Sequence, residues 1–233
     1  MMGGKAQELI YDKTNEASRN FKERMLQLNK TISDKLQEIH GKNWKTKVRD
    51  QRMPKELPTT VLGKEFKKAD GTPYVLSQDQ LYYLYNQFKD PGNRRAFESR
   101  FKGQDVDFVM EQITSLLDAD VKRWADWQVD ELYPAQYQIY NETYKDIYGT
   151  NMPWNLNYAG RIYYEGAKVE DYDLLQNPNA FQMAVGGAST KVRLGSSQPI
   201  ALMQGNDVLM TYLTDMEHFH THARILKNIN KLI

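Results

Sequence analysis

Cysteine is absent from this chain of 233 residues, which excludes disulfides and thiolate metal sites and fits a reducing cytosol. Proline and glycine are sparse, at 8 and 14 residues, and the 26% charged fraction argues against a wholly disordered protein. No run approaches eighteen consecutive apolar residues, and the N-terminus lacks the apolar core of a signal peptide. The sequence therefore predicts a chain with a sizeable core and no transmembrane helix.

Net charge is also nearly absent, at +1, but the charges are distributed unevenly. Residues 1–68 hold 16 Lys and Arg against 9 Asp and Glu, whereas the rest of the chain is acidic. Such asymmetry indicates either an acidic partner for the basic part or attraction between the two parts of one chain. The sequence leaves both readings open.

A long helix is predicted over residues 5–40, with Gly41 as its C-terminal stop. Its apolar residues recur at spacings of three and four, on one narrow face: Phe21, Met25, Leu28, Ile32, Leu36 and Ile39. Because the stripe is narrow, we expect this first segment, residues 1–41, to be only loosely tied to the rest. A helix tied so loosely to the rest of the chain is expected to self-associate through Phe21, Met25 and Ile32.

Residues 42–75 contain prolines and glycines that interrupt any long element, so we expect a basic, irregular linker with at most a short helical turn. Six cations and one anion lie within residues 42–55. Basic side chains neutralise phosphates, and an indole can stack on an unpaired base. The nucleic-acid candidates are Lys42, Trp44, Lys45, Lys47, Arg49, Arg52 and Lys55. The alternative is a solvated basic loop with Trp44 tucked into the core.

Residues 76–233 are predicted to form a helical core. Ser77 caps a helix that ends at 88, a turn follows at 90–93, and further helices are expected to 100 and over 105–117. The next helix, 119–148, contains Pro134, which predicts a kink near residues 130–134. Gly149 ends it. Its tyrosines share one face, which favours packing over ligand binding: Tyr133, Tyr137, Tyr140, Tyr144 and Tyr148.

Residues 150–206 are predicted to be an extended arm or a small hairpin, and 206–233 a closing helix. That helix places Val208, Tyr212, Met216, Phe219, Ala223 and Leu226 on one face. The fold class is therefore mainly α: a long N-terminal helix, an irregular helical core with an arm, and a closing C-terminal helix. The abrupt Lys-Leu-Ile end leads us to expect a fragment of a larger polypeptide.

Metal chemistry has one candidate set in the closing helix. Asp215, His218 and His222 lie on one face, and a carboxylate with two imidazoles is a legitimate ligand set. A solvated or partner-facing helix side explains the same residues, and the order fits neither the HExxH nor the HxxEH motif. No nucleophile and base can be assembled, so we expect no cofactor and no enzymatic activity, with a metal-dependent enzyme or toxin fragment as an alternative.

The helical blocks of residues 74–230 resemble a module of very large bacteriophage proteins, the large polyvalent or internal virion (ejection) proteins. The resemblance lies in the SQDQLYYLYNQFKDP helix, the tyrosine-rich block ending in IYG at Gly149, residues 157–166, and LTDMEHFHTHARILKNIN. In the second block Trp127, Tyr133, Pro134, Tyr137 and Tyr144 carry it. In the last, it rests on Met216, Glu217, His218 and Phe219. Ala159 and Gly160 replace the proline-containing form of that family.

The resemblance implies a structural module carried inside the virion and made in the cytoplasm of the host bacterium. Its implied partners are other virion proteins or further copies of itself, and phage DNA through residues 42–55 is the alternative. In that family the enzymatic activities reside in other modules of very long chains. The resemblance therefore carries over no catalytic residue.

Overall fold

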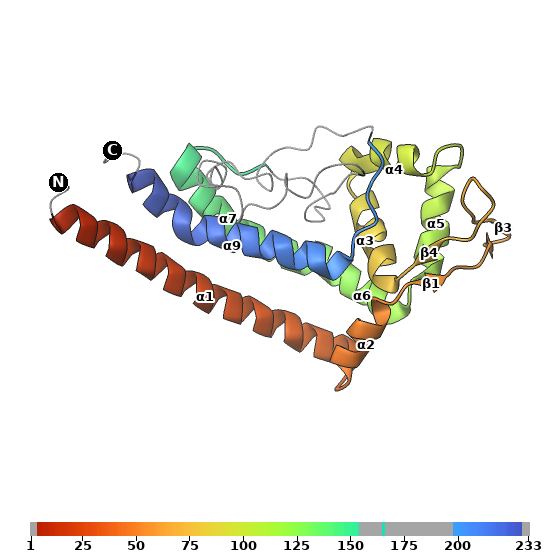
Figure 1. The fold of residues 1–233 in the computed structure, drawn as a ribbon, viewed down its shortest axis with the longest axis horizontal. Helices are drawn as coiled ribbons and strands as arrows, with labels where there is room; N and C mark the ends of the chain where they lie inside the picture. Colours follow the sequence, from red (N-terminus) through yellow and green to blue (C-terminus); the bar gives the residue numbers. More distant parts are fainter. Residues whose placement is uncertain (1–3, 154–164, 166–197, 230–233) are drawn as a thin grey trace.

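The computed structural model describes residues 4–153, 165 and 198–229, and this part of the chain is mainly helical (Figure 1). Helix α1, Gly4–His40, runs antiparallel to α9, Gly205–Ile229, and α7, Tyr133–Tyr148, lies on the other side of α9. The shorter elements gather at the end of the molecule where α1 finishes and α9 begins. The predicted mainly α fold, with long first and last helices, is confirmed.

From Leu28 to its end, helix α1 is firmly packed, contrary to the expectation of a loosely tied segment. Gly41 ends it with a φ of +76°, as predicted. Four residues of its stripe are buried in the same core as the side chains of α7 and α9: Leu28, Ile32, Leu36 and Ile39. The expectation failed because a narrow apolar stripe is sufficient when a matching helix of the same chain covers it.

Residues 42–75 are also more regular than the sequence indicates. They form helix α2, Trp44–Gln51, followed by two antiparallel pairs of two-residue strands. In the first pair, β1, Lys55–Glu56, joins β4, Val75–Leu76; in the second, β2, Thr60–Val61, joins β3, Lys64–Glu65.

This region contributes to the core, so the irregular linker was a wrong interpretation. Phe66 is fully buried and Tyr74 nearly so, in a cluster with side chains of the neighbouring helices. The buried Gln112 side chain donates to the carbonyl oxygen of Val61 at 2.9 Å. Prolines and glycines here shape tight turns between short paired strands, which sequence periodicity does not reveal.

The next helices begin and end close to their predicted bounds. They are α3, Gln78–Phe88, the 3₁₀ turn η1, Pro91–Asn93, α4, Arg94–Arg100, and α5, Val106–Leu116. A full capping box starts α3, since Ser77 accepts from the Gln80 amide and Gln80 accepts from the Ser77 amide. Asp105 caps α5 in a similar way. Asp118 precedes the next helix but makes no side-chain capping bond.

The predicted break near Pro134 is present as a π-helical turn, η2, Gln128–Leu132, between α6, Ala119–Trp127, and α7. Proline cannot donate a helical hydrogen bond, and the wider turn accommodates its ring at the start of α7. Gly149 ends α7 with a left-handed φ of +76°.

The tyrosine face of α7 is graded from buried to exposed. Tyr133 and Tyr140 are buried, at 2% and 0% exposure, and Tyr133 meets Tyr212 of α9 edge to face. Tyr137 and Tyr144 are half-buried, and Tyr148 is 39% exposed. The predicted packing role is confirmed most fully for Tyr133 and Tyr140, which point most directly at α9.

Helix α9 buries the predicted face, including Met216 and Phe219, between α1 and α7. Most of the predicted arm lies outside the described residues, including the 157–166 block of the resemblance apart from Glu165. Residues 198–204 are described and run beside α3 and α4; Ile200 is fully buried and its amide donates to the Ala96 carbonyl. No helix of the described ranges has the length and apolarity needed to cross a membrane.

Candidate functional site

The basic segment, residues 42–55, contains helix α2, which lies at the corner between α1 and the strands (Figure 1). Its cations are all exposed to solvent: Lys42, Lys45, Lys47, Arg49, Arg52 and Lys55. The helix has no buried residue, so its outer surface is available for contact. The structure therefore keeps the predicted cations together on one exposed element and its flanks.

Part of this positive charge is neutralised by the chain's own carboxylates. Arg52 lies 2.7 Å from Asp207 at the start of α9, and Lys47 lies 3.7 Å from Asp120 of α6. Arg49 is 3.5 Å from its neighbour Asp50. The pairs of Arg52 with Asp207 and of Lys47 with Asp120 connect the basic part of the chain to its acidic part. The reading of mutual attraction between the two parts is thus realised at α2.

Trp44 is not presented as a stacking platform. Its side chain is half-buried and packs against the core cluster shared by α1, α6 and α9, while Lys45 lies over its ring at 5.6 Å. A base would need an open indole face. The packing of Trp44 favours the alternative in which its side chain is tucked against the core.

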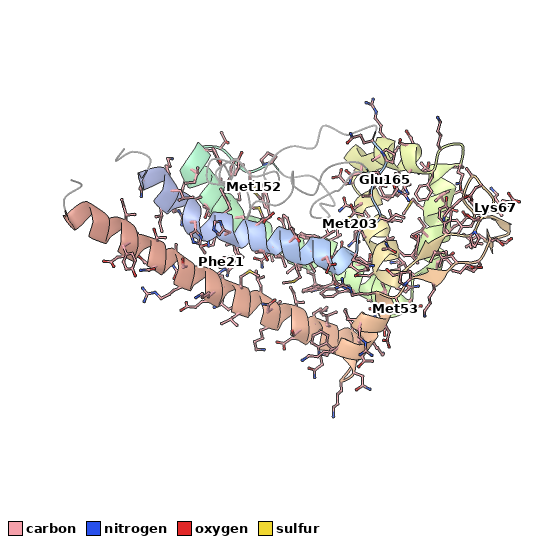
Figure 2. The ribbon with its side chains drawn as sticks, viewed as in Figure 1. Phe21, Met53, Lys67, Met152, Glu165 and Met203 are labelled. Atoms are coloured by element: carbon pink, nitrogen blue, oxygen red, sulfur yellow. The ribbon has the colours of Figure 1, made fainter. Side chains whose placement is uncertain are left out.

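An open pocket of about 570 Å³ lies beside α2. One of its lining residues, Met53, follows the end of that helix and is labelled in Figure 2. Its floor includes Leu57 and Leu76, and its rim carries charges of both signs, such as Lys55 and Asp118. The carbonyl of the nearby Gln78 side chain accepts from the Asp118 amide at 2.9 Å. The mixed rim gives the pocket no strong preference for an anion.

The histidine set in α9 is arranged for packing. The rings of His218 and His222 are stacked, with centroids 4.1 Å apart and planes at 10°, and Phe21 of α1 meets both edge to face. The Nδ1 atom of His222 lies 2.8 Å from the Thr221 hydroxyl. No group of three His, Cys, Asp or Glu side chains suited to a metal is found among the residues that the structure describes. Asp215, His218 and His222 thus do not form a ready ligand set.

The main polar feature of the core, which the sequence does not reveal, is a buried ion pair between α1 and α9. Glu217 is fully buried and accepts two hydrogen bonds from Arg24, at 2.7 Å from Nη2 and 3.1 Å from Nε. The Tyr140 hydroxyl of α7 donates to the same carboxylate at 3.1 Å. Burial and Glu217 raise the pKa of Tyr140 far above its ordinary value, so the phenol remains a donor.

A second polar cluster joins the N-terminus of α9 to α3. Oδ1 of the buried Asp79 accepts from the backbone amide and from the side-chain amide of Asn206, at 3.1 and 2.9 Å. Trp124 of α6 donates to Asn206 at 3.0 Å. Burial raises the pKa of Asp79 from 3.8 to about 6, against the lowering effects of the Asn206 bond and Arg52. Asp79 therefore supplies a cap for α9 from another helix.

Gly205 permits this close approach of α9 to α3. A Cβ at this position would lie 2.3 Å from the Tyr82 ring, which is buried in the core. Any larger residue would push the two helices apart.

No family model matches this chain, and comparison with the curated proteins and with the solved structures finds no match.

Proposed function

We propose that this chain is a structural module of a bacteriophage internal virion or ejection protein, and a fragment of a larger polypeptide. It acts through contacts with other virion proteins or with further copies of itself, inside a particle assembled in the host cytoplasm. The proposal rests on the resemblance of the helical blocks. One observation supports it: the blocks that carry the resemblance and lie within the described residues form α3, α6, α7 and α9, which meet in one core.

The use of polar groups in that core favours a structural role. Catalysis requires a nucleophile or base held against a second group in a pocket. Here Glu217 is saturated by Arg24 and Tyr140, and Asp79 holds the N-terminus of α9. These two buried carboxylates thus fix helices relative to one another. The open pocket beside α2 is lined by apolar side chains and by charged side chains of both signs, most of the latter exposed to solvent.

Mass spectrometry of purified particles tests the proposal. Particles of the phage whose genome encodes the chain should contain peptides from α3, α7 and α9, and emptied particles that have released their DNA should lack them. Capsid peptides, present in both samples, serve as the control. Detection of the chain only in the soluble fraction of infected cells, and never in particles, would overturn the virion assignment.

A nucleic-acid contact through α2 is a second candidate, supported by the exposed cations of residues 42–55. Lys42, Lys45 and Lys55 make no ion pair with any residue in the described ranges, so their charges remain available for phosphates. Fewer residues are available for this contact than the sequence predicts, because Trp44 packs on the core and Arg52 and Lys47 are paired with carboxylates.

A further inference from the structure

Two helices meet at a cluster of three rings. His218 and His222, one turn apart on α9, stack with centroids 4.1 Å apart, and Phe21 of α1 points its ring at them from 5.9 and 6.2 Å. Figure 2 labels Phe21 between the two helices. Both imidazoles are half-buried. We call these three side chains the ring cluster.

The ring cluster lies where α1 has few other attachments. The buried aliphatic residues of α1 begin at Leu28 and continue to its C-terminus, and the pair of Arg24 with Glu217 lies just before them. Among the described side chains of α1 that precede Arg24, beginning at residue 10, only Ala17 is buried. The first half of α1 therefore depends on the ring cluster for much of its contact with α9.

Few groups around the ring cluster offset an added positive charge, and one of them is the carbonyl of His218, which lies 3.2 Å from Nδ1 of His222. From α1, Arg24 is already paired with Glu217, and the neighbouring Lys22 is an exposed cation. From α7, Asp146 is paired with Arg224. On α9 itself, Asp215 lies one turn before His218.

Burial, and for His218 also its stacked neighbour, lowers the pKa of both histidines below 6.5. Protonation of one ring places a charge in a half-buried site, and protonation of the second places two like charges face to face.

We propose that the ring cluster is an acid-sensitive latch, which holds the part of α1 before Arg24 against α9 at neutral pH and releases it on acidification. The sign follows from linkage. A histidine whose pKa is lowered by folding stabilises the docked helix above its free pKa of 6.5, and this contribution is lost as the pH falls through the lowered value. Arg24 and the aliphatic residues after it keep the second half of α1 attached.

The absence of cysteine makes a direct test practical, because introduced thiols are the only labelling sites. Spin labels at Tyr11→Cys and Asn228→Cys, both exposed positions, report on α1 against α9. Double electron–electron resonance should give a narrow distance distribution at pH 7.5. At pH 5 it should become broader and shift to longer distances. Labels at Lys145→Cys and Asn228→Cys, on α7 and α9, should show no change.

Matched variants separate the ring cluster from the other histidines. In His218→Gln/His222→Gln the transition should move by at least one pH unit or disappear, because no proton is taken up in the cluster. In His220→Gln it should persist: burial lowers the pKa of His220 too, but its Nδ1 lies 2.8 Å from the Thr143 hydroxyl of α7 and its ring is not part of the ring cluster. If the double variant does not fold, His222→Gln alone should halve the number of protons coupled to release.

Three results would overturn the latch: an α1–α9 distance that is unchanged between pH 7.5 and 5, a transition that is retained in His218→Gln/His222→Gln, or a simultaneous change in the α7–α9 control. The last would mean that acid unfolds the whole bundle. His40, at the other end of α1 and 3.6 Å from Asp120, is a separate titrating group, and His40→Gln should leave the release unchanged.

Discussion

Arg24 and Glu217, separated by 193 residues in sequence, form a bidentate ion pair that fixes α1 against α9. The Glu217 side chain is fully buried and the Arg24 side chain is 26% exposed. A buried pair of this kind contributes little net stability compared with apolar residues of the same size, but breaking it leaves an uncompensated charge in the core. Its effect is to define how the two helices align.

Arg24→Met should destabilise the protein by about 3 kcal/mol, near the lower end of the usual range because Arg24 retains some exposure. Arg24→Met/Glu217→Met should recover most of that loss, since no buried charge remains. Urea unfolding of the single and double variants measures both values. Breaking the exposed pair of Lys30 and Asp34 with Asp34→Asn is the control and should leave the midpoint unchanged. A double variant as unstable as the single would refute this account.

Tyr140→Ala should lower the free energy of unfolding by about 3–5 kcal/mol, because it removes a fully buried ring and a donor to Glu217. Tyr148→Ala, at the exposed end of the same helix face, should cost less than about 1 kcal/mol. Chemical denaturation of the two variants gives the comparison. Equal losses of unfolding free energy would show that the difference in burial between Tyr140 and Tyr148 does not determine their contributions to stability.

Local signals in the sequence predicted the helices well. The capping box at Ser77, the periodic stripe of α1 and the break before Pro134 each depend on residues within a few positions of one another. The strands of residues 55–76 were missed because each is only two residues long, too short for a period of two to be visible.

The polar contacts of the core could not be predicted in the same way. Glu217 resembles any surface glutamate until α1 and α7 bring Arg24 and Tyr140 to it. Trp44 shows the same limit for the candidate site: its sequence neighbours are cations, but its spatial neighbours are the core residues of other helices. Sequence spacing therefore located the exposed cations but left open whether Trp44 packs on the core.

The stability of the protein should carry a pH dependence from Asp79. The pKa of Asp79 is about 6 in the folded chain, above its ordinary value of 3.8. The folded state therefore binds the proton of this carboxyl more tightly than the unfolded state does. The contribution is fully present below pH 3.8 and is lost as the pH rises through 6. Asp79→Asn cannot ionise and retains an acceptor for Asn206. It should therefore be more stable than the parent at pH 8, by up to about 3 kcal/mol at 1.36 kcal/mol per pKa unit.

Thermal unfolding of the parent and of Asp79→Asn between pH 4.5 and 8 measures this difference. The gap between the two curves should grow with pH and level off above about pH 7, since the carboxyl is then fully ionised. Asp107→Asn is the control. Asp107 is exposed in the first turn of α5, and Arg94 lowers the pKa of its carboxyl. A constant gap for Asp79→Asn across the range would mean that its carboxyl titrates normally.

Leu62 is strained at the tip of the β2–β3 hairpin, with a φ of +52° and a side chain 56% exposed. A left-handed conformation is unfavourable for leucine and acceptable for asparagine. Leu62→Asn should therefore stabilise the protein by about 1 kcal/mol. Leu26→Asn makes the same change at an exposed position within α1, where it should cost about 0.5 kcal/mol. Destabilisation by Leu62→Asn in thermal unfolding would indicate that the leucine packs usefully.

DNA binding, where it occurs through α2, should be weak, electrostatic and dependent on its unpaired cations. Lys42→Gln/Lys45→Gln/Lys55→Gln removes up to three phosphate contacts, which should flatten the log–log salt slope by up to about 2.7 at roughly 0.9 per contact. Lys47→Gln/Arg52→Gln should change the slope less per residue, because Asp120 and Asp207 already neutralise these two charges. Fluorescence anisotropy with labelled duplex DNA at several salt concentrations measures both slopes. An unchanged slope in the triple variant would place the contact elsewhere, and no binding at low salt would remove this function from the chain.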